Sequence, residues 1–343
     1  MRRSTPRDGP GKCRVRHWRH AGDPDRLPGR RRPHDRPPRR ARRPPRPGGR
    51  ARHPSRRGAA RDPSGRSHGH RLRQERPRRG WTGWKRTADR LRAATYHRAY
   101  LPHQSVRSAA LARWARIPER IGFAGAAGAF WYTKKVPRPK EGHEAERLLA
   151  LADSPPDAEA RIHLELTEDD RAAAYAWLAT KGVGDGFVAM APGSIWGTKR
   201  WGGYGDLARL LPGRIVLLGG PADHAAAQAV VDAAPDRVVD ATGELPLRVS
   251  AAVLERARVL VTNDSAPLHL ASATQTPTVA VFGPTVPAFG FGPRAAQAAI
   301  VERALPCRPC SAHGPERCPL GHHRCMREIP AAAVRDAINQ LIR

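Results

Sequence analysis

The first eighty residues lack the side chains that build a protein core. Residues 1–80 contain no isoleucine, phenylalanine or tyrosine, and Val15, Leu27 and Leu72 are their only branched aliphatic residues. Such a segment cannot bury enough apolar surface to offset the conformational entropy that folding costs. We therefore predict that residues 1–80 are disordered.

The chain also lacks a long hydrophobic run and contains few cysteines. No apolar stretch approaches the roughly 20 residues of a transmembrane helix, and no apolar stretch of secretory-signal length follows the basic N-terminus. A membrane-spanning or secreted protein is therefore not expected. We predict a cytoplasmic protein whose five cysteines are reduced.

Arginine and proline take the place of apolar side chains in the first segment. Residues 1–80 contain 27 Arg and 13 Pro, and their charge of +22 (28 Lys+Arg minus 6 Asp+Glu) is most of the chain's +30. Three interpretations stay open: an arm that binds nucleic acid, a tether to anionic lipid, or GC-rich DNA translated in the wrong frame. The frameshift is favoured, because a selected arm usually mixes lysine with arginine and adds stacking aromatics, whereas only Lys12 and Trp18 are present. Nucleic acid is therefore not expected as a partner.

Regular secondary-structure patterns begin at Trp81. Apolar residues recur at helical spacing near 85–96, 108–117 and 144–152, and a proline-rich, acidic linker follows them. We divide the chain into a basic segment, a remnant of an N-terminal domain, a larger domain with a cysteine-rich end, and a C-terminal helix. These parts cover residues 1–80, 81–160, 161–329 and 330–343.

Beyond the linker, predicted helices alternate with short apolar runs. The helices are expected at 168–180, 204–211, 222–234, 247–257 and 267–273. The strands are expected at 187–191, at 215–218, and in the segments RVVDATG, RVLVTND and TPTVAVFGPT. Continuous apolar runs are typical of strands buried on both faces, and intervening helices indicate a parallel sheet. The larger domain is therefore predicted to be a doubly wound α/β domain.

Polar and glycine-rich residues follow these strands, at the sheet edge where such domains bind ligands. Asp264 and Ser265 end one strand and open a helix, whose first N–H groups would face a diphosphate. We expect Ser265 to cap the helix, Asp264 to order the loop or bind a sugar hydroxyl, and His269 to face the same cleft. A helix cap with a structural histidine would leave the same pattern. No Walker loop is present and no GxGxxG follows the first strand, which weakens kinase and dehydrogenase interpretations.

Several segments, in their order and spacing, resemble family 9 glycosyltransferases, and more closely type II ADP-heptose:lipopolysaccharide heptosyltransferases. They are APGSIWGTKRW, LLGGPADHAAA, DATGELPL, VTNDSAPLHLASATQTPTVAVFGPT and the cysteine-rich end, together with YLPHQSVRSAALARWARIPERIGF and KVPRPKEGHEAERLL. The resemblance runs from about Trp81 to the C-terminus. It implies a GT-B-like fold of two Rossmann-type doubly wound domains, with the N-terminal domain incomplete in this chain and the C-terminal domain binding the donor.

The resemblance also implies roles for individual residues. Lys199 is a point charge suited to the leaving diphosphate, although a solvated loop lysine would look the same. Asp223 would lie near the adenosine ribose, and Ala266 stands where the family usually has glycine. The other donor-site residues would be Ser194, Asp264, Ser265 and His269. On the acceptor side, where phosphorylated sugars need cations, the candidates are Arg107, Arg120 and His143.

The implied reaction transfers heptose from ADP-heptose to the inner-core heptose of lipopolysaccharide with inversion, needs no cofactor, and involves peripheral contact with the inner membrane. It requires a general base for the acceptor hydroxyl and a cation for the diphosphate. The base is expected after the first strand of the N-terminal domain, where this chain has its Arg/Pro segment. No strand is predicted before Gly22-Asp23, so Asp23 is not assigned, and we expect weak ADP binding and impaired transfer. The alternatives are another GT-B nucleotide-sugar enzyme, or a nucleic-acid- or membrane-binding protein acting through residues 1–80.

Four cysteines cluster near the C-terminus. Cys307, Cys310, Cys318 and Cys325, with His313, His322 and His323 between them, provide the ligand types of a structural zinc site. The spacing of the second pair is irregular, and the resemblance extends to this run without implying that metal is bound. A structural zinc and a set of reduced thiols both stay open.

Overall fold

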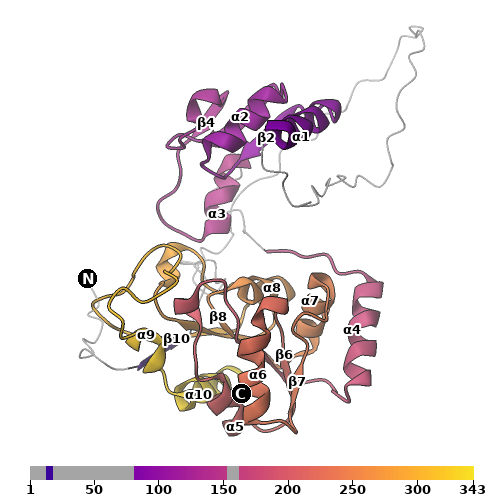
Figure 1. The fold of residues 1–343 in the computed structure, drawn as a ribbon, viewed down its shortest axis with the longest axis vertical. Coiled ribbons are helices and arrows are strands. Elements are labelled where there is room, and N and C mark those ends of the chain that lie inside the picture. The colour runs from indigo at the N-terminus through magenta and orange to yellow at the C-terminus, as the bar shows by residue number, and fades with distance from the viewer. Residues whose placement is uncertain (1–12, 18–80, 153–161) are drawn as a thin grey trace, which may run out of the picture.

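The computed structural model describes residues 13–17, 81–152 and 162–343, which form a small N-terminal and a larger C-terminal domain (Figure 1). Most of the segment predicted to be disordered lies outside the described residues, as do Gly22-Asp23 and residues 153–161 of the linker. Among the described helices, none combines the length and the apolar character that crossing a bilayer requires.

The C-terminal domain is built on a seven-stranded sheet with the order β1-β10-β9-β8-β5-β6-β7. All neighbouring strands are parallel except the pair of β1 and β10. The strands are β1 (Cys13–His17), β5 (Val188–Ala191), β6 (Ile215–Leu217), β7 (Val238–Asp240), β8 (Val259–Asn263), β9 (Thr278–Phe282) and β10 (Ala298–Arg303). The five strands predicted for this domain are all present, whereas β10 was not predicted.

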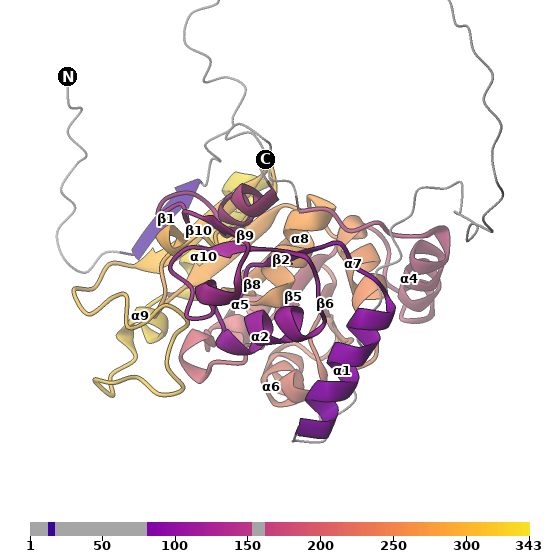
Figure 2. The ribbon, with the colours of Figure 1, turned by 90° about the horizontal axis from the view of Figure 1, so that it is seen from above.

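Helices cover both faces of this sheet, because its central strands are apolar on both sides. In β5, Val188 and Met190 pack into a core with α5, α6 and α10, whereas Ala189 and Ala191 pack into a second core with α4, α7 and α8. The helices are α4 (Glu168–Thr180), α5 (Tyr204–Leu210), α6 (His224–Ala233), α7 (Leu247–Arg256), α8 (Ala266–Thr274), α9 (Arg324–Arg327) and α10 (Ala331–Leu341). Figure 2 shows this layering from above. The doubly wound α/β fold is confirmed.

Strand β1 corrects two expectations about the basic segment. It pairs antiparallel with β10 over five residues, and the half-buried Cys13 and Val15 pack against the core. Not all of residues 1–80 is therefore without regular structure, and a strand does precede Gly22-Asp23. The physical reason is that the open edge of β10 offers backbone donors and acceptors that almost any extended segment can pair with. This strand belongs to the C-terminal sheet, and so it is not the first strand of the N-terminal domain.

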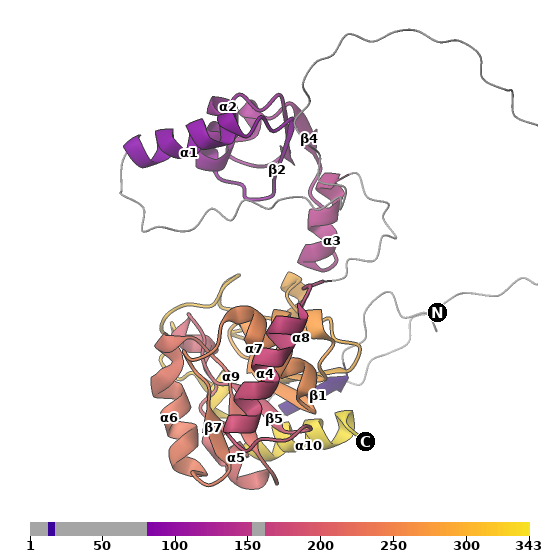
Figure 3. The ribbon, with the colours of Figure 1, turned by 90° about the vertical axis from the view of Figure 1, so that its right-hand side faces the viewer.

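The small domain contains a three-stranded parallel sheet in the order β2-β3-β4. Its elements are α1 (Trp81–Ala93), β2 (Arg98–Leu101), α2 (Val106–Trp114), β3 (Glu119–Phe123), β4 (Lys134–Val136) and α3 (Glu144–Leu149). The helices agree with the predicted helical segments, but the short strands had no clear period in the sequence. Figures 1 and 3 show α3 between the sheet of this domain and the C-terminal domain.

Candidate functional site

The strand order places a topological switch point between β5 and β8. From β5 the chain runs outward through β6 and β7 on one side, and through β8, β9 and β10 on the other. Open α/β sheets bind ligands where the strand order reverses, at the carboxyl ends of the strands. The loops that follow β5 and β8 contain most of the predicted donor-site residues.

Asn263, the last residue of β8, ties these loops together. Its Nδ2 donates to the carbonyl oxygens of Pro192 (2.9 Å) and Gly193 (3.2 Å), and its Oδ1 accepts from the N–H of Trp201 (3.2 Å). The side chain is fully buried. Sequence reasoning missed this residue, although an amide side chain at the end of an apolar strand is an uncommon choice that could have drawn attention to it.

Lys199 and Asp264 form a buried ion pair at the switch point. Lys199 Nζ lies 2.6 Å from Asp264 Oδ2, with side-chain exposures of 11% and 9%. The same oxygen accepts a hydrogen bond of 2.7 Å from Thr285 Oγ1. Two roles were predicted for Asp264: ordering its loop or binding a sugar hydroxyl. Its ion pair with Lys199 agrees with the first role, because it ties the loop after β8 to the loop after β5. Thr285, in the FGPT segment, was not predicted to belong to the site.

The start of α8 lacks the predicted side-chain cap. Ser265 occupies the N-cap position, but its hydroxyl makes no capping hydrogen bond and lies 3.4 Å from Thr262 Oγ1. Ala266 follows as the first helical residue. Pro267 has no N–H, and the N–H of Leu268 donates to the carbonyl oxygen of Ser265 at 3.1 Å. The N–H of Ala266 is therefore the first-turn donor that can face an anion.

His269 lies one turn further along α8, within reach of the charges of Lys199 and Asp264. Burial lowers its pKa, the positive charge of Lys199 lowers it further, and Asp264 opposes the shift. The imidazole is therefore neutral at pH 7 and can act as a hydrogen-bonding group rather than as a cation. Its ring meets Phe291 edge to face, with 6.5 Å between the centroids.

Asp223 closes the site on the side of β6. Its Oδ2 accepts a hydrogen bond of 2.9 Å from the N–H of Gly220. The carboxylate packs so closely on Gly193 that a Cβ there would come within 2.0 Å of Asp223 Oδ1. Ser194, which follows Gly193, is buried, and its carbonyl oxygen accepts a hydrogen bond of 2.8 Å from Arg200 Nε. The predicted donor residues thus line the ends of β5, β6 and β8 together.

Two of the three predicted acceptor-side residues have structural roles. Arg120 donates to the carbonyl oxygens of Ile117 (2.6 Å), Pro118 (3.1 Å) and Trp131 (2.8 Å). His143 is the N-cap of α3: its Nδ1 accepts from the N–H of Ala145 at 3.1 Å, and its Nε2 lies 3.2 Å from the carbonyl oxygen of Gly292. Both side chains are thus bonded to backbone groups, and their acceptor roles stay predictions. Arg107 is exposed in the first turn of α2, and its acceptor role stays a prediction.

The N-cap role of His143 leads to a pH-dependence that can be tested. Burial lowers the pKa of His143 to about 4, with a further contribution from Arg294. In an unfolded chain the imidazole titrates near 6.5, so the unfolded state binds the extra proton first as the pH falls. We expect thermal stability to be complete above pH 6.5 and to decline between pH 6.5 and 4. In His143→Asn, which keeps a capping side chain but cannot titrate there, melts recorded from pH 7 to 4 should show a smaller decline.

The cysteine-rich loop contains the four cysteines considered as ligands of a structural zinc. Cys325 is buried in the core, and Cys307 Sγ lies 4.0 Å from His322 Nε2. Among residues 13–17, 81–152 and 162–343, no group of three or more His, Cys, Asp or Glu side chains is placed to hold a metal ion. Cys325 is the most buried of the four cysteines, and a structural zinc at these residues stays a prediction.

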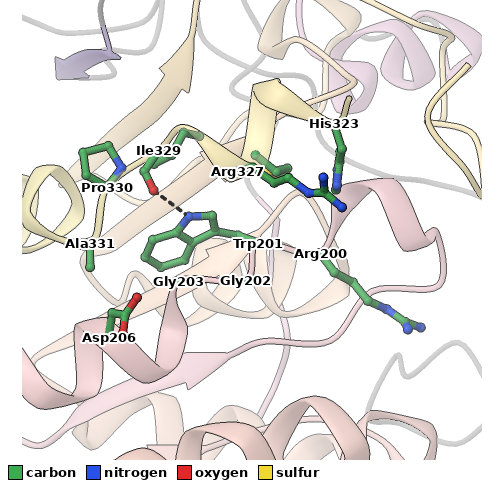
Figure 4. Close-up of a pocket in the computed structure, with 11 residues that line it drawn as sticks. Arg200, Trp201, Gly202, Gly203, Asp206, His323, Arg327, Ile329, Pro330 and Ala331 are labelled. Atoms are coloured by element: carbon green, nitrogen blue, oxygen red, sulfur yellow. Dashed lines mark hydrogen bonds between the residues drawn. The ribbon is translucent and has the colours of Figure 1, made fainter. Parts of the chain in front are cut away.

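The same loop contacts the turn that carries Lys199. Thr198 Oγ1 donates to the carbonyl oxygen of Pro315, and His323 Nε2 lies 2.8 Å from the carbonyl oxygen of Thr198. Beside this turn a cleft of about 400 Å³ is lined by Trp201, whose Nε1 donates to the carbonyl oxygen of Ile329 at 3.0 Å (Figure 4). No predicted donor residue lines this cleft.

Comparison with known proteins identifies the family of the chain. Residues 84–318 match the model of glycosyltransferase family 9 (heptosyltransferase). The chain belongs to this family. Family membership confirms the resemblance seen in the sequence.

Two curated relatives are heptosyltransferases. The chain is 26% identical over 226 residues to lipopolysaccharide heptosyltransferase 2 of Salmonella typhimurium, which covers 60% of this chain and 65% of the relative. It is 37% identical over 84 residues to lipooligosaccharide heptosyltransferase 2 of Campylobacter jejuni, which covers 24% of this chain and 25% of the relative. The chain thus matches from a quarter to just under two thirds of the length of these relatives.

Solved structures of the family share the fold. The E. coli ADP-heptose LPS heptosyltransferase II superimposes with a TM-score of 0.63 and 24% identity, covering 76% of this chain and 80% of that chain. An E. coli heptosyltransferase with ADP-2-deoxy-2-fluoro heptose gives a TM-score of 0.52 and 23% identity, covering 76% of each chain. These likenesses confirm the GT-B-like architecture predicted from the sequence.

Proposed function

We propose that this glycosyltransferase family 9 chain binds ADP-heptose and transfers heptose to the inner-core heptose of lipopolysaccharide. The observation that carries the proposal is the Lys199–Asp264–Thr285 network at the switch point between β5 and β8. A related heptosyltransferase has been solved with an ADP-heptose analogue, which supports a nucleoside diphosphate sugar as the ligand class.

The described residues can supply the electrophilic half of the reaction. Lys199 is held beside the start of α8, so that its ammonium and the N–H of Ala266, at the positive end of the helix dipole, can act on one diphosphate. Both would stabilise the negative charge that develops on the diphosphate as the anomeric bond breaks. His269, neutral at pH 7, can donate or accept a hydrogen bond at the sugar or phosphate.

The nucleoside would lie toward the ends of β6 and β7. Asp223 is fixed there by Gly220, and its carboxylate can accept hydrogen bonds from ribose hydroxyls. The acceptor would bind on the N-terminal side, where Arg107 stays the candidate cation. No general base is assigned there, so we expect transfer to be impaired. A lipid-anchored acceptor would bring the protein to the cytosolic face of the inner membrane.

Nucleotide titration of the full chain tests the donor assignment. We expect calorimetry to show ADP binding at least tenfold tighter than UDP binding, and Asp223→Ala to weaken ADP binding by about tenfold, roughly 1.4 kcal/mol. Asp236→Ala, which removes a carboxylate from the loop before β7, serves as the control and should bind ADP normally. Equal or tighter binding of UDP would instead favour another GT-B nucleotide-sugar enzyme.

A further inference from the structure

A single loop contacts both the donor-site helix and the helix that leads in from the N-terminal domain. We call residues 286–294, which follow β9, the bridging loop. On the donor side, Phe291 packs edge to face on His269. The N–H of Arg294 donates to Ser272 Oγ in α8 at 2.9 Å, and its carbonyl oxygen accepts from Gln275 Nε2 at 3.3 Å. The bridging loop is therefore anchored along α8.

On its other side the bridging loop is bonded to α3. The N–H of Glu144 donates to the carbonyl oxygen of Gly290 at 2.9 Å, and Arg147 Nη1 donates to that of Phe289 at 2.9 Å. Gly290 has a φ of +95°, and a Cβ there would lie 3.0 Å from the Glu144 nitrogen, so that this approach needs glycine. The two backbones are thus in direct contact.

Arg294 joins both sets of contacts through different atoms. Its backbone is bonded to α8, whereas its guanidinium forms an ion pair of 2.7 Å with Glu146 of α3. The Arg294 side chain is 12% exposed, which makes this pair less screened by solvent than an ordinary surface pair. The neighbouring N-cap His143 adds the contact to Gly292.

Helix α3 is fixed by polar contacts. It spans six residues, and none of them is buried. A helix without a buried face is oriented by its directional polar contacts rather than by a hydrophobic core. Those of α3 lead to the bridging loop and to the segment before the helix, where Arg138 pairs with Glu144 at 2.7 Å and the carbonyl oxygen of Lys140 accepts from Arg147 at 3.1 Å. Figure 3 shows α3 standing on the C-terminal domain near α8.

We propose that Arg294 is a positioning residue that sets the orientation of α3, and with it the acceptor-side domain, according to the position of the donor helix α8. Arg294 contacts the C-terminal end of α8, so a displacement of this helix is passed through Arg294 and Glu146 to α3. The coupling between α8 and α3 is inferred from contacts that exist without any ligand. Only its response to ADP depends on the proposed function.

Hydrogen exchange of the full chain tests the coupling without any ligand. Arg294→Ala keeps the backbone bonds to α8 and removes the ion pair, so amides of residues 144–149 should exchange at least tenfold faster while those of β8 stay unchanged. Arg294→Lys, which keeps the charge, should restore most of the protection. Arg171→Ala, which breaks a pair of 2.9 Å between α4 and α7, is the matched control and should leave α3 unaffected. Unchanged exchange of α3 in Arg294→Ala would overturn the proposal.

ADP adds a readout that a merely structural role would not change. In the unmodified chain, ADP should slow the exchange of residues 144–149, although the proposed ADP contacts all lie in the C-terminal domain. Arg294→Ala should lose this response while its affinity for ADP stays within twofold. A persisting response in that variant would overturn the positioning role. If the unmodified chain does not bind ADP, the proposed function fails, and the ligand-free comparison still decides the coupling.

Discussion

Replacing Lys199 with alanine is expected to abolish nucleotide binding and to destabilise the C-terminal domain. The ammonium is the partner of a carboxylate that is 9% exposed, and removing it leaves Asp264 with the Thr285 hydroxyl as its remaining described partner. Breaking a buried ion pair by deleting one partner typically costs about 3–5 kcal/mol, because the remaining charge is uncompensated. Denaturant unfolding should show that loss, and calorimetry should show ADP affinity reduced by at least a hundredfold, about 2.7 kcal/mol.

Two further variants separate binding from folding. Lys181→Ala removes an exposed lysine that pairs with Glu244 at 3.3 Å, and should change stability by less than about 1 kcal/mol. The double variant Lys199→Met/Asp264→Leu removes both charges and should recover much of the stability, but none of the ADP affinity. If the double variant bound ADP normally, Lys199 would have no part in the donor site.

The second large effect is expected at Asn263. Alanine there would leave the N–H of Trp201 and the carbonyl oxygens of Pro192 and Gly193 without this partner inside the fold. A buried polar group left without a partner costs about 1–3 kcal/mol, so the unfolding free energy should fall by roughly 3 kcal/mol or more. ADP affinity should fall as well, because the loop after β5 loses its connection to β8.

An exposed asparagine provides the comparison. Asn339→Ala, on the outer surface of α10, should leave both the unfolding free energy and ADP binding unchanged. Hydrogen exchange in residues 192–201 should rise in Asn263→Ala alone. Normal exchange of that loop in Asn263→Ala would show that other contacts hold it in place.

The periodicity of the sequence was enough to predict the larger domain. Its apolar runs and amphipathic helices alternate over many residues. A continuous apolar run indicates a strand buried on both faces, and an amphipathic pattern indicates a helix buried on one face. Strand β10 was missed because AAIVER follows a loop rather than a predicted helix. Strand β1 was missed because its pairing depends on an open edge almost 300 residues away, and its own composition argues against any buried structure.

The donor-site residues were found by their position after strands, but their interactions were not. Sequence reasoning placed Lys199, Asp264 and His269 at one sheet edge, yet it could not show that Asp264 pairs directly with Lys199 and also accepts a hydrogen bond from Thr285. It also placed Arg120 and His143 on the acceptor side, and it could not show that their side chains form hydrogen bonds with backbone groups. A side chain's charge is visible in the sequence, whereas its partner is visible only in the fold.

What the sequence determined by itself is therefore the fold class, the family, and the sheet edge at which the donor is expected to bind. These follow from local patterns and from motifs in a fixed order. The tertiary structure decided which charges are neutralised, which cysteines are buried, and how Arg294 joins α8 to α3. Those properties arise between residues far apart in the chain, where distance and exclusion of water set the energy of each polar contact.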